Sequence, residues 1–127
     1  AGTGAGAAAL CLASRVSGCT VVGLEKDRQL SALASENIKA NQLDGRVRIV
    51  SGDIMAPPPD LKPESYHYVI ANPPHLKVGQ SRPSPYLERR KARLESSVVL
   101  SDWVGFGLIF YNNLYLFYIF LKLLYQH

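Results

Sequence analysis

Hydrophobic and polar residues follow a strand–helix–strand order along the first half of the chain. Apolar, β-branched runs at 20–25 and 47–53 each end on an acid, which is typical of buried parallel strands. Between them, apolar residues recur at helical spacing after Asp27, a favoured N-cap residue, and we expect this helix to close near Gly45. A third run at 66–72 predicts another strand, which ends on an asparagine.

The chain opens on glycines at positions 2, 4 and 6, followed by alanines and leucines. This pattern predicts a glycine loop that begins a helix at about residues 5–16. The proline-rich segments 55–65 and 75–88 are expected to be loops, and a basic amphipathic helix is expected from about 87 to 103. Strands and helices in this order predict an α/β fold with a parallel sheet and flanking helices.

Three polar residues, Glu25, Asp53 and Asn72, fall at the carboxyl ends of the predicted strands. In parallel sheets ligands bind at these ends, and a glycine loop before a helix allows an anionic or polar group to approach the backbone. Glu25 lies about 20 residues after the glycine loop, the distance expected for an acid that hydrogen-bonds ribose hydroxyls. A nicotinamide cofactor is the rival ligand, but its motif has glycines at 1, 3 and 6 instead of 1, 3 and 5. Asp53 suits a mononucleoside whose adenine amine needs an acceptor.

The succession GTGAG at 2–6, Glu25, SGD at 51–53 and NPP at 72–74 resembles the class I S-adenosylmethionine-dependent methyltransferases, which have a Rossmann-like sheet. The resemblance implies that the glycine loop holds the amino-acid end of the cofactor, Glu25 its ribose and Asp53 its adenine amine. The implied cofactor-binding residues are Gly2, Thr3, Gly4, Gly6, Glu25, Lys26, Asp53, Ile54 and Asn72. No metal site is expected.

The segment Asn72-Pro73-Pro74-His75 is similar to the (N/D/S)-P-P-(Y/F/W) signature of methyltransferases that modify exocyclic or amide nitrogens. The lone pair of an adenine amine is delocalised into the ring, so two acceptors on its hydrogens are needed to localise it. The resemblance implies that Asn72 Oδ1 and the Pro73 carbonyl are these acceptors and that all four residues are catalytic. His75 replaces the aromatic ring that normally stacks on the target base, which must leave its own stack.

The segment 77–93 carries six basic residues and one acid, a net charge of +5, which predicts contact with a phosphate backbone. Downstream spacing resembles the valine-tRNA (adenine-N6)-methyltransferase branch in Gly79, Ser84, Pro85, Arg90, Ala92, Glu95, Leu100 and Trp103. The resemblance implies a cytoplasmic enzyme that methylates adenine N6 in tRNA. Protein glutamine or ribosomal-RNA guanine methylation, and a non-catalytic fragment of such an enzyme, remain alternatives.

Both ends of the chain depart from this family. Its members carry an apolar strand before the glycine loop, so we expect residues 1–103 to form a partial methyltransferase domain, truncated at the first strand. The segment 104–127 contains all four phenylalanines and has no counterpart in the family. Three interpretations compete: a membrane-spanning helix, a buried helix or strand pair, and an out-of-frame or recombined tail. We favour the last and expect the tail to be helical and poorly packed. Two asparagines near its middle disfavour membrane contact.

Composition sets broad limits on the kind of protein. Apolar residues make up 47% and charged residues 19%, which excludes collagen-like and wholly disordered chains. The formal net charge of +4 permits an anionic partner without requiring one. Cys11 and Cys19 have no metal-ligating neighbours, and we expect both to be reduced, buried thiols of an intracellular protein.

Overall fold

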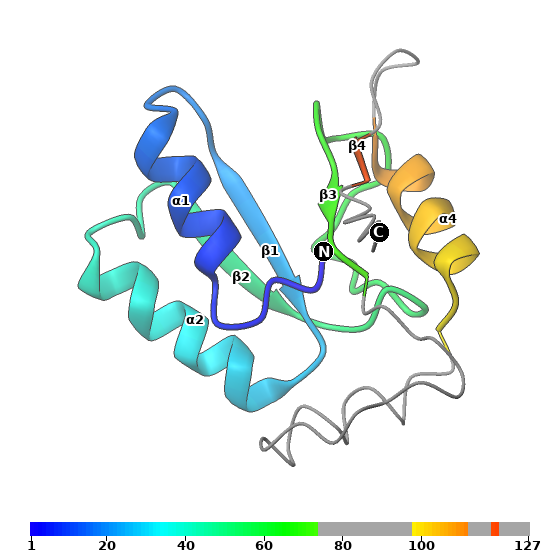
Figure 1. The fold of residues 1–127 in the computed structure, drawn as a ribbon, viewed down its shortest axis with the longest axis horizontal. Coiled ribbons are helices and arrows are strands. Elements are labelled where there is room, and N and C mark those ends of the chain that lie inside the picture. The colour runs from blue at the N-terminus through cyan, green and yellow to red at the C-terminus, as the bar shows by residue number, and fades with distance from the viewer. Residues whose placement is uncertain (74–97, 112–117, 120–127) are drawn as a thin grey trace, which may run out of the picture.

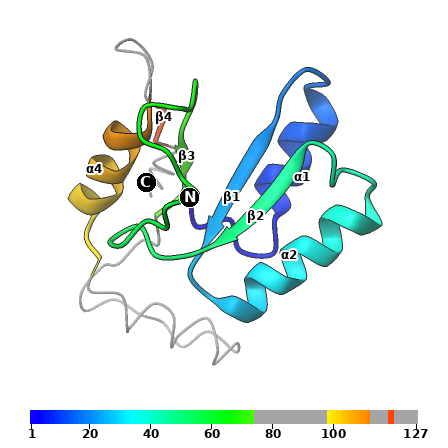
Figure 2. The same ribbon diagram turned by 180° about the vertical axis from the view of Figure 1, so that it is seen from behind.

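The computed structural model describes residues 1–73, 98–111 and 118–119. Helices α1 and α2 cover one face of the strands β1 and β2, while α4 lies beside β3 (Figure 1 and, from behind, Figure 2). The elements are α1 (Ala7–Arg15), β1 (Val21–Glu25), α2 (Arg28–Ala40), β2 (Val47–Ser51), β3 (Ile70–Ala71), α4 (Leu100–Phe110) and β4 (Tyr118–Ile119). Helices packed on parallel strands confirm the predicted α/β class.

Strands β1 and β2 form a parallel pair in which Val21 lies opposite Val47 and Glu25 opposite Ser51. One face of this pair is buried against α1 and α2 because both helices present small or branched apolar side chains to it. The buried cluster on this side comprises Ala9, Ala13, Ile38, Leu43 and Val47. The pairing brings the carboxyl ends of the first two predicted strands next to each other.

Strands β3 and β4 form a second parallel pair. Within the part of the chain that the structure describes, no strand pairing joins β1 to β3. The first residues of the chain lie between them, where the Thr3 amide donates to the Leu24 carbonyl at 3.0 Å and the Ala1 nitrogen donates to the Ile70 carbonyl at 2.6 Å. The start of the glycine loop therefore connects the two sheets by backbone hydrogen bonds.

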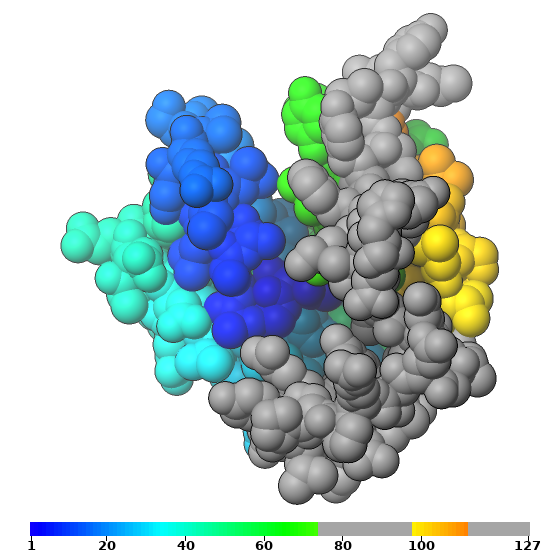
Figure 3. Space-filling model, viewed as in Figure 1, coloured from blue at the N-terminus to red at the C-terminus, as the bar shows by residue number. Residues whose placement is uncertain are grey.

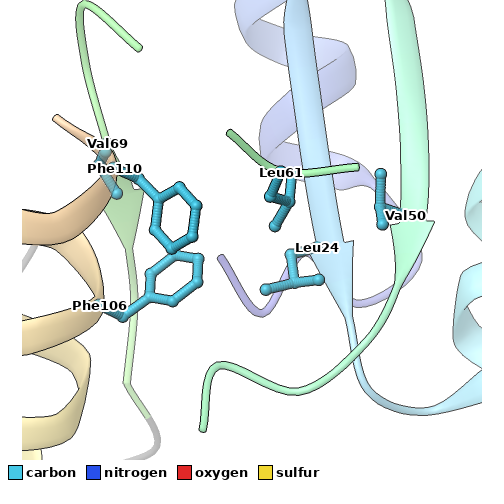
Figure 4. Packing of buried hydrophobic residues seen from close by; sticks show 6 residues of the cluster. All are labelled: Leu24, Val50, Leu61, Val69, Phe106 and Phe110. Carbon is cyan, nitrogen blue, oxygen red and sulfur yellow. The ribbon is translucent and has the colours of Figure 1, made fainter. Parts of the chain in front are cut away.

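A hydrophobic core also connects the two halves. In Figure 4 the rings of Phe106 and Phe110, from α4, point toward Leu24 and Leu61. The cluster comprises Leu24, Val50, Leu61, Val69, Phe106 and Phe110. The two phenylalanine rings pack with their centroids 4.6 Å apart. Since this burial removes apolar surface from water, α4 belongs to the folded core, and the expectation of a poorly packed segment after residue 103 is wrong for these two residues.

Some element boundaries differ from those that the sequence predicts. Helix α2 ends at Ala40 instead of near Gly45, because Gln42 adopts a left-handed conformation with φ 56°. The Asn41 side chain also donates to the Asn37 carbonyl at 2.8 Å and satisfies a terminal acceptor of the helix. The third predicted strand shortens to Ile70–Ala71, since upstream of it only a bridge between Tyr66 and Tyr111 forms.

Other predictions are tested only in part. Residues 75–97, which include the predicted loop and most of the predicted basic helix, lie outside the described residues. Helix α4 begins at Leu100 and continues to Phe110, beyond residue 103, where the basic helix was expected to end. Cys11 is exposed on α1 and Cys19 is half-buried, so the prediction that both thiols are buried is wrong, although both are free. None of the described helices is long and apolar enough to cross a membrane.

Candidate functional site

The glycine loop, defined as Gly2–Gly6, turns sharply into α1. Gly4 has φ 56° and Gly6, the N-cap of α1, has φ 90°, conformations that side chains with a Cβ rarely adopt. A Cβ on Gly4 would meet nothing within 4 Å, whereas one on Gly6 would lie 3.2 Å from the Ala34 Cβ. The loop thus has open space over Gly4 and close packing against α2 under Gly6.

Glu25, at the carboxyl end of β1, holds the glycine loop. Its Oε2 accepts from the Gly4 amide at 2.7 Å, and its Oε1 accepts from the Asp27 amide at 3.0 Å. Asp27 caps α2 as predicted, since its Oδ1 accepts from the amides of Gln29 and Leu30. One carboxylate therefore fixes both the loop and the entry to α2, and each oxygen keeps a lone pair for a further donor.

Two residues that the sequence analysis did not assign to the site also support the loop. The Asn37 side-chain amide, on α2, donates to the Ala5 carbonyl at 3.0 Å. The ring of Trp103, on α4, lies against Gly2, with Cη2 2.9 Å from the position that a Cβ would take. Both contacts join residues far apart in sequence, so no local pattern predicts them.

Asp53 follows β2 and carries the ion pair of this region. Its Oδ1 accepts from the Met55 amide at 3.0 Å, and its Oδ2 lies 2.7 Å from Lys26 Nζ. The hydrogen bond from Lys26, followed in size by that from the Met55 amide, holds the pKa of Asp53 below its usual value. The Asp53 carboxylate is therefore anionic and fixed in orientation at neutral pH.

Ile54, the next residue, is half-buried and packs against the core that contains Leu24.

The carboxyl ends of β1, β2 and β3 face the same side of the molecule, at the bottom of Figure 1. The Gly52 amide donates to the Glu25 carbonyl at 2.8 Å, which brings the first two strand ends together. Asn72 follows β3 directly and is exposed, while Pro73 is buried. Pro74 and His75 lie outside the described residues, so their predicted roles are not tested.

Figure 3 shows the face of the molecule that is seen in Figure 1. The N-terminal residues, in dark blue, reach the surface near the middle of this face, between the half that contains α1 and α2 and the half that contains β3 and α4. A hydrogen bond joins the glycine loop to Glu25, and the ion pair between Lys26 and Asp53 lies at the same two strand ends.

Comparison with known protein families accounts for this arrangement. The model of the methyltransferase small domain family matches residues 1–86. The chain belongs to this family. The match includes every residue that the sequence analysis placed in the site.

Three individual proteins that are similar to this chain have the same name. A tRNA1(Val) (adenine(37)-N6)-methyltransferase of Aeromonas salmonicida is 33% identical over 103 residues, which cover 79% of this chain and 42% of the relative. The protein of the same name from Tolumonas auensis is 31% identical over 104 residues, covering 80% of this chain and 42% of the relative. The protein of the same name from Porphyromonas gingivalis strain W83 is 33% identical over 109 residues, which cover 81% of this chain and 40% of the relative.

These matches confirm the branch that the downstream spacing predicted, and the chain spans about 40% of the length of these relatives. Family membership implies S-adenosylmethionine as the methyl donor. The chemistry of the site fits this cofactor: nothing lies within 4 Å of a Cβ placed on Gly4, and Glu25 offers lone pairs for hydroxyl donors. Each Asp53 oxygen likewise has one partner and keeps a lone pair for an amine donor, and at Oδ2 that donor would share the oxygen with the Lys26 ammonium.

Proposed function

We propose that this chain is the cofactor-binding part of an N-methyltransferase that transfers a methyl group from S-adenosylmethionine to N6 of an adenine in tRNA. The observation that carries the proposal is the hydrogen bond from the Gly4 amide to Glu25, which joins the glycine loop to a carboxylate suited to ribose. The names of the relatives supply the adenine and the tRNA.

Each part of the site has a proposed role toward the cofactor. The glycine loop, with Thr3, holds its amino-acid end beside the start of α1, because the first amides of that helix have no helical partners and lie at the positive end of its dipole. Glu25 accepts from the ribose hydroxyls, and Asp53 accepts from the adenine amine. Lys26 and Ile54, the residues next to these two acids, line the site.

Asn72 and Pro73 are the proposed catalytic acceptors. The bound sulfonium supplies an activated methyl carbon, so the protein does not need a strong base. Asn72 Oδ1 and the Pro73 carbonyl accept hydrogen bonds from the two N–H groups of the target amine, which localises its lone pair toward the methyl carbon. The methylated nitrogen then releases one proton to water. The rate enhancement comes from alignment and electrostatic stabilisation. Pro74 and His75 complete the motif, with His75 as the platform on which the target base stacks.

The basic segment 77–93 is the proposed contact with the tRNA backbone, because its net charge of +5 follows directly after the catalytic motif. We propose a cytoplasmic location, for which a tRNA substrate is the supporting argument. We further propose that residues 1–103 form the partial methyltransferase domain and that 104–127 lie outside the family pattern. Phe106 and Phe110 nevertheless pack on the core of that domain.

The test separates cofactor binding from catalysis. Calorimetric titration with S-adenosylmethionine and S-adenosylhomocysteine should give binding, and radiolabelled methyl groups should pass to tRNA lacking this modification. Asn72→Ala should lower methyl transfer by at least ~100-fold and leave cofactor affinity nearly unchanged. Equal loss of both would contradict the catalytic role of Asn72.

The same assay decides between acceptors. Ribosomal RNA and a glutamine-containing peptide are offered in place of tRNA, and transfer to either one instead of tRNA would identify the acceptor as guanine or glutamine. Cofactor binding without transfer to any acceptor would favour the alternative that the chain is a non-catalytic fragment. The observation that supports this alternative is that the chain covers 42% of the Aeromonas salmonicida relative.

A further inference from the structure

The ion pair between Lys26 and Asp53 engages one of the two carboxylate oxygens that the proposed cofactor site offers to the adenine amine. Asp53 Oδ1 accepts from the Met55 amide at 3.0 Å, two residues ahead in the same turn. Its Oδ2 lies 2.7 Å from the Lys26 ammonium. The turn fixes the direction of the carboxylate, so Oδ2 is the oxygen whose partner can change without refolding the backbone.

The position of the pair in the sheet explains why it forms. Lys26 directly follows β1, and Asp53 is the second residue after β2. Glu25 lies opposite Ser51, and the Gly52 amide donates to the Glu25 carbonyl at 2.8 Å. The ion pair therefore spans two adjacent strand ends at the edge where Glu25 would hold the ribose.

The exposure of the two side chains makes this contact exchangeable. The Lys26 side chain is 69% exposed and that of Asp53 is 26% exposed. Water and salt screen ion pairs at such positions, and ordering the long lysine side chain costs entropy, so their net contribution is small. A ligand group that hydrogen-bonds to Oδ2 can therefore replace the ammonium.

We propose that Lys26 competes with the cofactor: its ammonium holds Asp53 Oδ2 in the ligand-free protein, and the adenine amine of the methyl donor displaces it on binding. This inference rests on the proposed function of the site. Lys26 is then a residue that sets cofactor affinity by occupying Asp53, in contrast to the direct cofactor contact that the family resemblance implies for it.

The experiment compares cofactor affinity in matched variants of the full chain by calorimetric titration with S-adenosylhomocysteine, which is electrically neutral overall. Lys26→Gln removes the competitor and should tighten binding about 2- to 5-fold at low salt. Added salt weakens the ion pair of the original protein. The difference in affinity between the original protein and Lys26→Gln should therefore shrink as sodium chloride rises from about 20 to about 500 mM, because the Debye length shortens over this range.

Two controls isolate the ion pair. Lys26→Arg retains the cation and should keep the affinity of the original protein. Lys62→Gln removes an equal charge from an exposed lysine in the connection before β3 and should leave the affinity unchanged. If Lys62→Gln tightened binding as much as Lys26→Gln, net charge and not the contact with Asp53 would be responsible, and the inference would fail.

The remaining outcomes are distinct. Weaker binding by Lys26→Gln would show that Lys26 contacts the cofactor directly and would overturn the competition while leaving the proposed function in place. Equal binding by the original protein and Lys26→Gln would overturn the competition in the same way. Absence of binding by every variant would overturn both the competition and the proposed cofactor.

Discussion

The Gly4 amide donates a 2.7 Å hydrogen bond to Glu25 Oε2 across 21 positions of sequence. A carboxylate at a strand end thereby orders a loop whose glycine conformations make it intrinsically costly to order. The same side chain binds the Asp27 amide at the entry to α2. The local structure of the glycine loop and of the entry to α2 thus depends on one residue.

We expect Glu25→Ala to lower the free energy of unfolding by about 1–2 kcal/mol, because two charge-assisted hydrogen bonds are lost at a half-buried site. Cofactor affinity should fall at least ~10-fold, since the ribose acceptor is also lost. Trp103, the only tryptophan, packs against Gly2 and offers a fluorescence signal for binding. Glu36→Ala, at an exposed position of α2, is the matched control, and equal losses in both variants would refute this role of Glu25.

Gly6→Ala should destabilise the protein by about 1–3 kcal/mol, because the φ of 90° is strained for alanine and the new Cβ would lie 3.2 Å from that of Ala34. Urea denaturation followed by circular dichroism measures this change. At Gly18 a Cβ would meet nothing within 4 Å, so Gly18→Ala should have little effect. A similar loss in both variants would mean that the left-handed conformation of Gly6 is not required.

Phe110→Ala tests whether α4 belongs to the folded domain. Phe110 is 3% exposed and packs with Phe106 and Leu24, so its truncation should cost about 3 kcal/mol. Leu108 lies on the same helix and is 61% exposed, and Leu108→Ala should change stability by less than about 0.5 kcal/mol. Thermal unfolding of both variants distinguishes a core helix from a loosely attached one. If α4 were loosely attached, Phe110→Ala and Leu108→Ala would lose equal amounts of stability.

The pKa of Asp53 gives a prediction with a definite sign. Lys26 and the Met55 amide hold this pKa below its value in the unfolded chain. The stability that the carboxylate contributes is therefore present above the unfolded-state pKa and is lost as the pH falls through the lower folded-state pKa. Lys26→Gln should raise the pKa of Asp53, measured from its carboxyl ¹³C shift against pH. Lys62→Gln should leave it in place, and no rise in Lys26→Gln would argue against the contact in solution.

The sequence predicts well those features that depend on neighbouring residues. Asp27 was expected to cap α2 because an acid preceding a helical pattern is a local signal, and its Oδ1 does accept from two helix amides. The apolar runs that end on an acid placed Glu25 and Asp53 correctly at adjacent strand ends. Both follow from the order of elements in parallel sheets.

Features that depend on distant partners were not predictable. Asn37 holds the Ala5 carbonyl across 32 positions, and nothing near Asn37 in the helical pattern distinguishes it from a solvated amide. The shortening of the third strand depends on its partner, since β3 pairs with β4 and not with β1. The contact of Lys26 with Asp53 likewise requires the strand register, which the sequence alone did not give.

The position of the first three residues has a mechanical consequence. Ala1 and Thr3 bind the backbones of different sheets, and the glycine loop begins between them. A ligand that stiffens this loop should therefore damp motion of one sheet against the other, and amide hydrogen exchange in β1 and near β3 should slow together on ligand binding. Occupancy of the loop would then be linked to the relative motion of the two sheets that its first residues bridge.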